Sequence, residues 1–146
     1  MNTPSSNLLL LLQTAAALQA GVAVLNLFLV RLLGWKADLA RLPLLAREVF
    51  QVHLWFISIT LGIFAAVTWR FAGDFAQGTH PLCHWLAAGI GIFWGIRWVM
   101  QFAYYSGSHW RGHAARTVAH IGLLAVYGGF AAVYLWAAWR GTGGAL

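Results

Sequence analysis

Four long apolar runs dominate the chain and restrict what it can fold into. They cover residues 8–33, 48–69, 82–105 and 115–139, and shorter, more polar segments separate them. A bilayer core about 30 Å thick requires roughly 20 apolar residues for each helical crossing, so each run is long enough to cross once. We therefore expect an all-α integral membrane protein, a single transmembrane domain of 146 residues built as a four-helix bundle.

The small number of charged residues supports this prediction. Only 8% of the residues are charged and 61% are hydrophobic, whereas a soluble domain carries about 25% charged residues. The net charge of +6 would suggest nucleic-acid binding in a soluble protein. Here the basic residues lie mostly between the apolar runs, where they set topology and meet anionic headgroups. We therefore expect the lipid bilayer as a partner and no nucleic acid.

The distribution of basic residues predicts the orientation of the chain. The first and third connections, with the residues that border them, contain Arg31, Lys36, Arg41, Arg47, Arg111 and Arg116. The opposite side contains only Arg70 and Arg140. Because basic connections stay in the cytoplasm, we expect a multi-pass protein of the cell inner membrane with both termini on the external side. The uncharged leader and the long first run differ from a signal peptide, so we retain that run as a span.

Each span contributes a polar group at a similar depth. At about 1.5 Å per residue, these groups lie roughly 6–12 Å from the cytoplasmic ends of the spans. They are Asn26, His53, Arg97 with Gln101, and His120. We predict a polar pocket in the cytoplasmic leaflet built from these five residues. Four further residues are expected at its mouth: Glu48, Tyr104, His113 and Arg116.

Helical periodicity groups some of these residues on common faces. Arg97, Gln101 and Tyr104 follow the i, i+4, i+7 spacing, which places them on one side of a helix. We expect that side to lie opposite Gly91 and Gly95, a pair of small residues that predicts close helix packing. On the fourth span a polar stripe recurs every seven residues: His113, His120, Tyr127 and Tyr134.

Arg97 is the most costly member of this polar layer. An arginine near the centre of a span costs about 2.5–3.5 kcal/mol on insertion scales, and ionisable residues within spans are functional candidates for that reason. Glu48 is the nearest carboxylate in the sequence pattern, although the adjacent Arg47 competes for it. The alternative is purely structural, because interhelical hydrogen bonds worth about 0.6–2 kcal/mol each also fix helix register.

The first functional interpretation is a redox or electron-transfer subunit that binds haem b. The second and fourth spans run in the same direction, and His53 and His120 match in depth, as two axial iron ligands must. Arg97 would neutralise a propionate and Asn26 would complete the cofactor site. The arrangement is similar to small four-helix membrane cytochromes b in architecture alone.

The second interpretation is a membrane-embedded enzyme or binding site for a lipid, isoprenoid or quinone headgroup. Arg97 would hold an anionic or carbonyl oxygen. Gln101 or Tyr104 would orient the headgroup. The acid or base would be His53, His120 or Glu48, and imidazole suits that role because it titrates near neutral pH. The third interpretation is a structural subunit of a larger membrane complex, or a homo-oligomer, with no site of its own.

A separate metal site has weaker support. His80 and His84, like His109 and His113, have the H-x₃-H spacing that places two rings on one helix face. Proline disfavours helix at the residue before it, and Pro81 follows His80 directly. We therefore expect His80 and His84 to be interfacial or capping residues.

Overall fold

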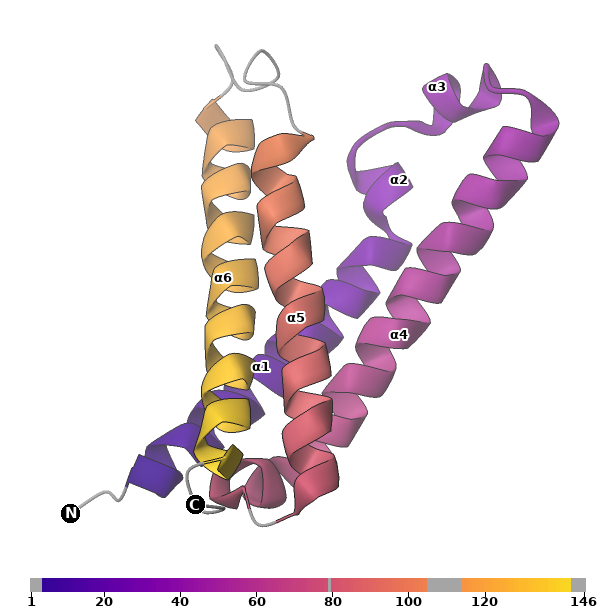
Figure 1. Ribbon diagram of the computed structural model, residues 1–146. Coiled ribbons are helices and arrows are strands. Elements are labelled where there is room, and N and C mark those ends of the chain that lie inside the picture. The colour runs from indigo at the N-terminus through magenta and orange to yellow at the C-terminus, as the bar shows by residue number, and fades with distance from the viewer. Residues whose placement is uncertain (1–3, 79, 105–113, 143–146) are drawn as a thin grey trace. The chain divides into compact units, whose positions relative to one another are not determined.

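The computed structural model describes residues 4–78, 80–104 and 114–142, and this part of the chain is helical with no strand. Its helices are α1 (Pro4–Leu27), α2 (Leu29–Leu32), α3 (Lys36–Ala40), α4 (Leu44–Gln77), α5 (Pro81–Ala103) and α6 (Ala114–Thr142) (Figure 1). Within the described residues four segments are long and apolar enough to cross a membrane: Ser5–Leu27, Leu44–Arg70, Pro81–Ala103 and Thr117–Arg140. The predicted all-α chain with four helices of spanning length is confirmed. The external termini and the inner membrane stay predictions.

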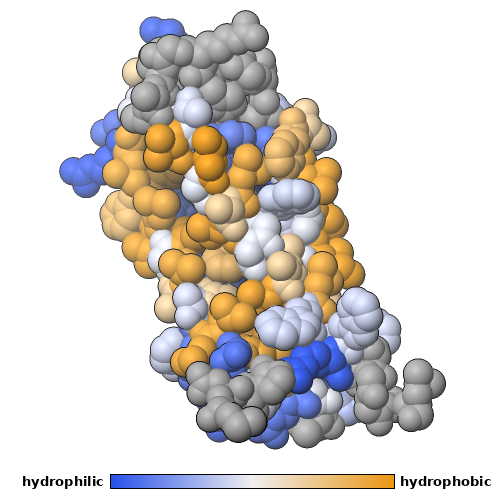
Figure 2. Space-filling model, turned by 90° about the vertical axis from the view of Figure 1, so that its left-hand side faces the viewer, coloured by the Kyte–Doolittle hydropathy of each residue, from blue (hydrophilic) through white to orange (hydrophobic). Residues whose placement is uncertain are grey.

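The surfaces of these helices are apolar. On α4, Leu45 is 72% exposed and Phe56 is 67% exposed, and apolar side chains predominate on the face drawn in Figure 2. Each Å² of such surface costs about 25 cal/mol when water covers it, and lipid removes that cost. The exposed surface therefore indicates a membrane protein.

The first helix is shorter than predicted. It ends at Leu27, because Phe28 leaves the helical conformation with φ −96° and ψ 1°. The short helix α2 then closes in a Schellman motif, in which the N–H of Trp35 donates to the carbonyl of Val30 over 3.0 Å. Gly34 enables this turn by adopting φ +68°, a conformation that costs other residues more. The predicted span 8–33 is therefore wrong at its end.

The fourth helix is longer than predicted and bends. It continues past the expected end at residue 69 through Arg70 and Asp74 to Gln77. The bend lies at Phe71, where φ is −113° and ψ is 22°. Gly78 then ends the helix with φ +64°. Polar residues did not mark the end of this helix, because an exposed charged side chain continues a helix as readily as an apolar one.

The start of α5 follows the sequence prediction. His80 is the N-cap in an extended conformation, Pro81 is the first helical residue, and Nδ1 of His80 accepts a 3.3 Å hydrogen bond from the N–H of Leu82. The capping role of His80 is confirmed. Because His80 lies outside the helix, it does not share a helix face with His84. His109 and His113 lie outside the described residues.

The helices form two compact units, each of which we describe by itself. Met1–Leu12 and Phe71–Leu146 form the first, which we call the α5–α6 unit, and Gln13–Arg70 forms the second, which we call the α1–α4 unit. In the first, α5 and α6 pack along each other (Figure 1). In the second, α2 and α3 connect the end of α1 to the start of α4. The single-domain bundle stays a prediction.

Close packing in the α5–α6 unit occurs at one of the two predicted glycines. A Cβ placed on Gly91 would lie 2.9 Å from Cγ of Leu135, whereas a Cβ on Gly95 would meet nothing within 4 Å. Trp94 is 1% exposed, and its ring stacks on Tyr127 with centroids 5.2 Å apart. The helix pair is therefore tightly packed around Gly91 and Trp94.

Candidate functional site

A chain of polar contacts links α5 to α6. Nη1 of Arg97 donates to Oε1 of Gln101 over 3.0 Å. Nε2 of Gln101 lies 2.9 Å from Nδ1 of His120. Gln101 is 2% exposed, whereas Arg97 and His120 are half-buried. Three of the five residues predicted to form the polar pocket are thus in contact.

The hydrogen-bond donors in this series of contacts determine which ring nitrogen of His120 carries the proton. A guanidinium only donates hydrogen bonds, so the atom of Gln101 that faces Arg97 must be the amide oxygen. The amide nitrogen therefore faces His120 and donates to Nδ1, which must be unprotonated. A neutral ring in this arrangement carries its proton on Nε2.

Aromatic residues support the charged end of this chain. The Cζ atom of Arg97 lies 5.0 Å from the ring centroid of Tyr127. Tyr127 stacks on Trp94, and Trp94 in turn contacts Phe130 with centroids 4.7 Å apart. A cation over an aromatic face gains about 0.5–2 kcal/mol, the larger value when the pair is desolvated. The guanidinium is therefore oriented by both Gln101 and Tyr127, and Arg97 and His120 make further interactions as well.

We expected the side of α5 that carries these polar residues to lie opposite Gly91 and Gly95, and this prediction is wrong. Gly91 lies against Leu135 and Gln101 against His120, and both partners belong to α6. Gln101 follows Gly91 by ten residues, roughly 2.8 turns at about 3.6 residues per turn, which leaves the two positions within a quarter turn of each other. The two residues therefore lie on the same side of α5.

Tyr104 lies apart from the buried contact. It is the C-cap of α5 and is 78% exposed, because the helix ends one residue before it. An exposed position suits the mouth of a site better than its interior. Its predicted part in orienting a headgroup stays a prediction.

A second polar contact lies in the α1–α4 unit. Nδ2 of Asn26 donates to the carbonyl of Leu54 over 3.0 Å and to Oγ of Ser58 over 2.9 Å. Ser58 donates to the same carbonyl over 2.9 Å. Asn26 is the second-last residue of α1, so α1 ends closer to it than predicted, and its contact with Leu54 places it level with the residue that follows His53. Ser58 is 6% exposed and was missed, because one hydroxyl in an apolar run is a weak signal.

The remaining predicted residues lie on α4 or outside the described side chains. His53 and Glu48 belong to the α1–α4 unit and have exposed side chains. His113 lies outside the described residues, and Arg116 is described as backbone alone. The predicted residues thus belong to two units, and each unit is described by itself. The five-residue pocket and the pairing of His53 with His120 stay predictions.

The contacts of His120 bear on the haem hypothesis, which stays a prediction. A metal-ligating histidine binds through one ring nitrogen and almost always donates its other N–H to an acceptor. In His120 the nitrogen Nδ1 is itself an acceptor, so Nε2 carries the proton. In this arrangement His120 does not fit an axial iron ligand.

Comparison with known proteins adds no assignment. No family model, curated protein or solved structure matches this chain. The function is therefore argued from the chemistry of the site.

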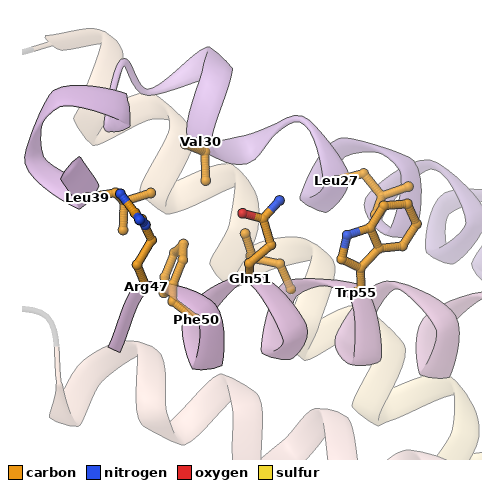
Figure 3. A pocket seen from close by; sticks show the side chains of 8 residues that line it. Leu27, Val30, Leu39, Arg47, Phe50, Gln51 and Trp55 are labelled. Atoms are coloured by element: carbon orange, nitrogen blue, oxygen red, sulfur yellow. The ribbon is translucent and has the colours of Figure 1, made fainter. Parts of the chain in front are cut away.

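The α1–α4 unit also contains a pocket that the sequence analysis missed. It has a volume of about 150 Å³ and is lined by Leu27, Val30, Leu39, Arg47, Phe50, Gln51, Leu54 and Trp55 (Figure 3). Arg47, Gln51 and Trp55 follow one another at four-residue intervals, so they share a face of α4. That spacing was a readable signal. The opposite wall was not readable, because it depends on how the chain turns after α1.

Proposed function

We propose that the α5–α6 unit binds the oxygen-bearing headgroup of a lipid-soluble molecule, a lipid, an isoprenoid or a quinone. Arg97 would hold an anionic or carbonyl oxygen, and Nε2–H of His120 would donate a second hydrogen bond. The observation that carries this proposal is the chain from Arg97 through Gln101 to His120.

The positive charge of Arg97 in this series of contacts favours ligand binding over a purely structural role. Fixing helix register needs only neutral hydrogen bonds, and such bonds already join α1 to α4 at Asn26. A guanidinium within a span costs more and adds nothing to register that a neutral amide lacks. An anionic or carbonyl oxygen offsets this cost, because charge-assisted hydrogen bonds are stronger than neutral ones.

Gln101 has a positioning role in this proposal. Its amide orients the Arg97 guanidinium and at the same time holds the tautomer of His120 that donates through Nε2. Such preorganisation reduces the ordering cost of binding. The same N–H would serve as a general acid if a reaction follows binding, since imidazole transfers protons near neutral pH.

The test is ligand binding to the purified full-length protein in detergent. The probes are a decyl-substituted benzoquinone and farnesyl monophosphate, which carry a carbonyl and an anionic oxygen respectively. Their binding is followed by tryptophan fluorescence, because Trp94 stacks on the Tyr127 ring beneath Arg97. We expect Arg97→Gln to weaken binding of at least one probe by about tenfold to a hundredfold.

Arg140→Gln is the matched control for this experiment. Arg140 lies over a tryptophan ring of α6, Trp136, at 5.9 Å, and its loss changes the net charge equally. The control should bind both probes as the natural protein does, and thermal unfolding identifies any variant that fails to fold. Equal binding by natural protein and Arg97→Gln, or equal loss in both variants, would refute the proposal.

A further inference from the structure

The pocket of the α1–α4 unit has the size of a headgroup site. Its volume is about 150 Å³, whereas sites that enclose a whole small molecule measure about 300–1,000 Å³. A group of a few non-hydrogen atoms fits, while the rest of a larger molecule would remain outside.

The lining of the pocket combines one positive charge with apolar walls. Arg47 is the charged residue of the lining, and Gln51 and the Trp55 indole add further polar groups. Arg47 and Gln51 project from α4 towards Leu39 and Val30, and the indole of Trp55 lies beside Leu27 (Figure 3). A guanidinium binds phosphate through two parallel hydrogen bonds. The lining is therefore suited to a phosphate group attached to an apolar body.

The position of the pocket in the chain favours an anionic lipid. Residues 27–55 contain four basic residues, Arg31, Lys36, Arg41 and Arg47, against two acidic ones, Asp38 and Glu48. Basic clusters beside a span attract anionic headgroups. Trp35 and Trp55 belong to the residue type that is enriched at the membrane–water interface. The pocket thus belongs to a segment with the character of a membrane interface.

We infer that this pocket binds the phosphate of an anionic phospholipid from the surrounding bilayer. Arg47 binds the phosphate oxygens and the amide of Gln51 donates to the headgroup. The apolar wall formed by Val30, Leu39 and Leu54 contacts the glycerol and the first methylenes. This inference uses other residues than the headgroup site at Arg97 and does not depend on it.

The experiment counts lipids retained by the full-length protein in native mass spectrometry. Phosphatidylglycerol is the probe and phosphatidylcholine, which has no net charge, is the reference. We expect Arg47→Gln to weaken phosphatidylglycerol binding by about tenfold to a hundredfold. The effect should persist in an Arg97→Gln background, which separates this site from the one proposed above.

Arg41→Gln is the matched control, because it removes the same charge from the same segment at a position that is exposed like Arg47 but lies outside the lining. We expect a change of less than about twofold for this control, since an exposed charge that does not line a pocket interacts weakly. Equal loss in Arg41→Gln and Arg47→Gln would reduce the effect to general surface attraction and overturn the inference.

A second variant tests the cavity itself. Val30→Phe fills the pocket without changing charge, and we expect it to displace phosphatidylglycerol as Arg47→Gln does. If Arg47→Gln does not fold, Val30→Phe tests lipid binding in its place. Retained binding in a folded Val30→Phe variant would overturn the inference. Displacement of the lipid by an equal concentration of inorganic phosphate would do so as well, since the apolar wall would then contribute nothing.

Discussion

The two polar contacts within the spans differ in charge. Asn26 binds Leu54 and Ser58 through neutral groups, whereas Arg97, Gln101 and His120 combine a permanent cation with a titratable ring. Both contacts join residues that are distant in the sequence, and both are shielded from solvent in part. The neutral contact shows how little is needed to hold two helices in register. The charge of the second contact therefore exceeds what register requires.

The two units also differ in how they are packed. In the α5–α6 unit, Trp94 is buried and Leu135 fits against Gly91, so the donors near Arg97 have a firm support. The α1–α4 unit instead has a partly open pocket beside Arg47. A rigid support holds donor groups in a fixed geometry, while a hollow admits a group from outside. The proposed headgroup site at Arg97 thus rests on a packed support, whereas the proposed phosphate site at Arg47 rests on open space.

The largest expected effect concerns haem and is all-or-none. Because Nδ1 of His120 accepts a hydrogen bond, we expect protein purified from cells with ample haem to lack a Soret band. Absorption spectra of the oxidised and reduced protein are the measurement. A Soret band that disappears in both His53→Ala and His120→Ala would restore the haem hypothesis and would place residues of both units in one site.

Replacement of Gln101 by leucine should cause the next largest effect. The side chain is 2% exposed, and its removal takes a hydrogen-bond partner from both Arg97 and His120. Leaving buried polar groups unsatisfied costs about 1–3 kcal/mol. Unfolding in a series of denaturing detergent mixtures measures this loss. Gln101→Glu serves as the contrast, because it can still accept from Arg97.

The four spans were predictable because hydropathy measures the cost of placing residues in lipid. Helix ends were less predictable. Residues 28–33 are nearly as apolar as the helix before them, and only Gly34 marked the turn. Near the C-terminal end of α4, Arg70 and Asp74 were predicted to belong to a connection, although α4 includes both.

The candidate site was predictable in part for similar reasons. The four-residue spacing from Arg97 to Gln101 and the depth of His120 indicated a contact, and the structure brings these three residues together. For the pocket beside Arg47, the face of α4 was predictable from its four-residue spacing, but the opposite wall with Val30 and Leu39 was not. The placement of that wall depends on backbone angles at Phe28 and Gly34, which hydropathy does not report.

The turn after α2 provides a smaller test of the same comparison. Gly34 has φ +68° and open space around its Cα, so an alanine there is strained by its backbone alone, at about 1–2 kcal/mol. We expect Gly34→Ala to lower stability and to weaken phosphatidylglycerol binding together, since the turn sets the wall of the pocket. Gly62→Ala in α4 is the control, because Gly62 also has open space and lies in a helix. An unchanged lipid affinity in a destabilised Gly34→Ala variant would separate the turn from the pocket.

The smallest expected effect belongs to the neutral contact. Interhelical hydrogen bonds in membranes are worth about 0.6 kcal/mol on average and reach about 1.7 kcal/mol, so Asn26→Leu should cost less than Gln101→Leu. Ser58→Ala removes part of the same contact. The double variant should therefore cost less than the sum of the two single variants, as residues in one network do. Unfolding free energies from the same detergent series provide all three values. If Asn26→Leu costs as much as Gln101→Leu, the charged contact carries no surplus over the neutral one, and the argument for a ligand at Arg97 loses its basis.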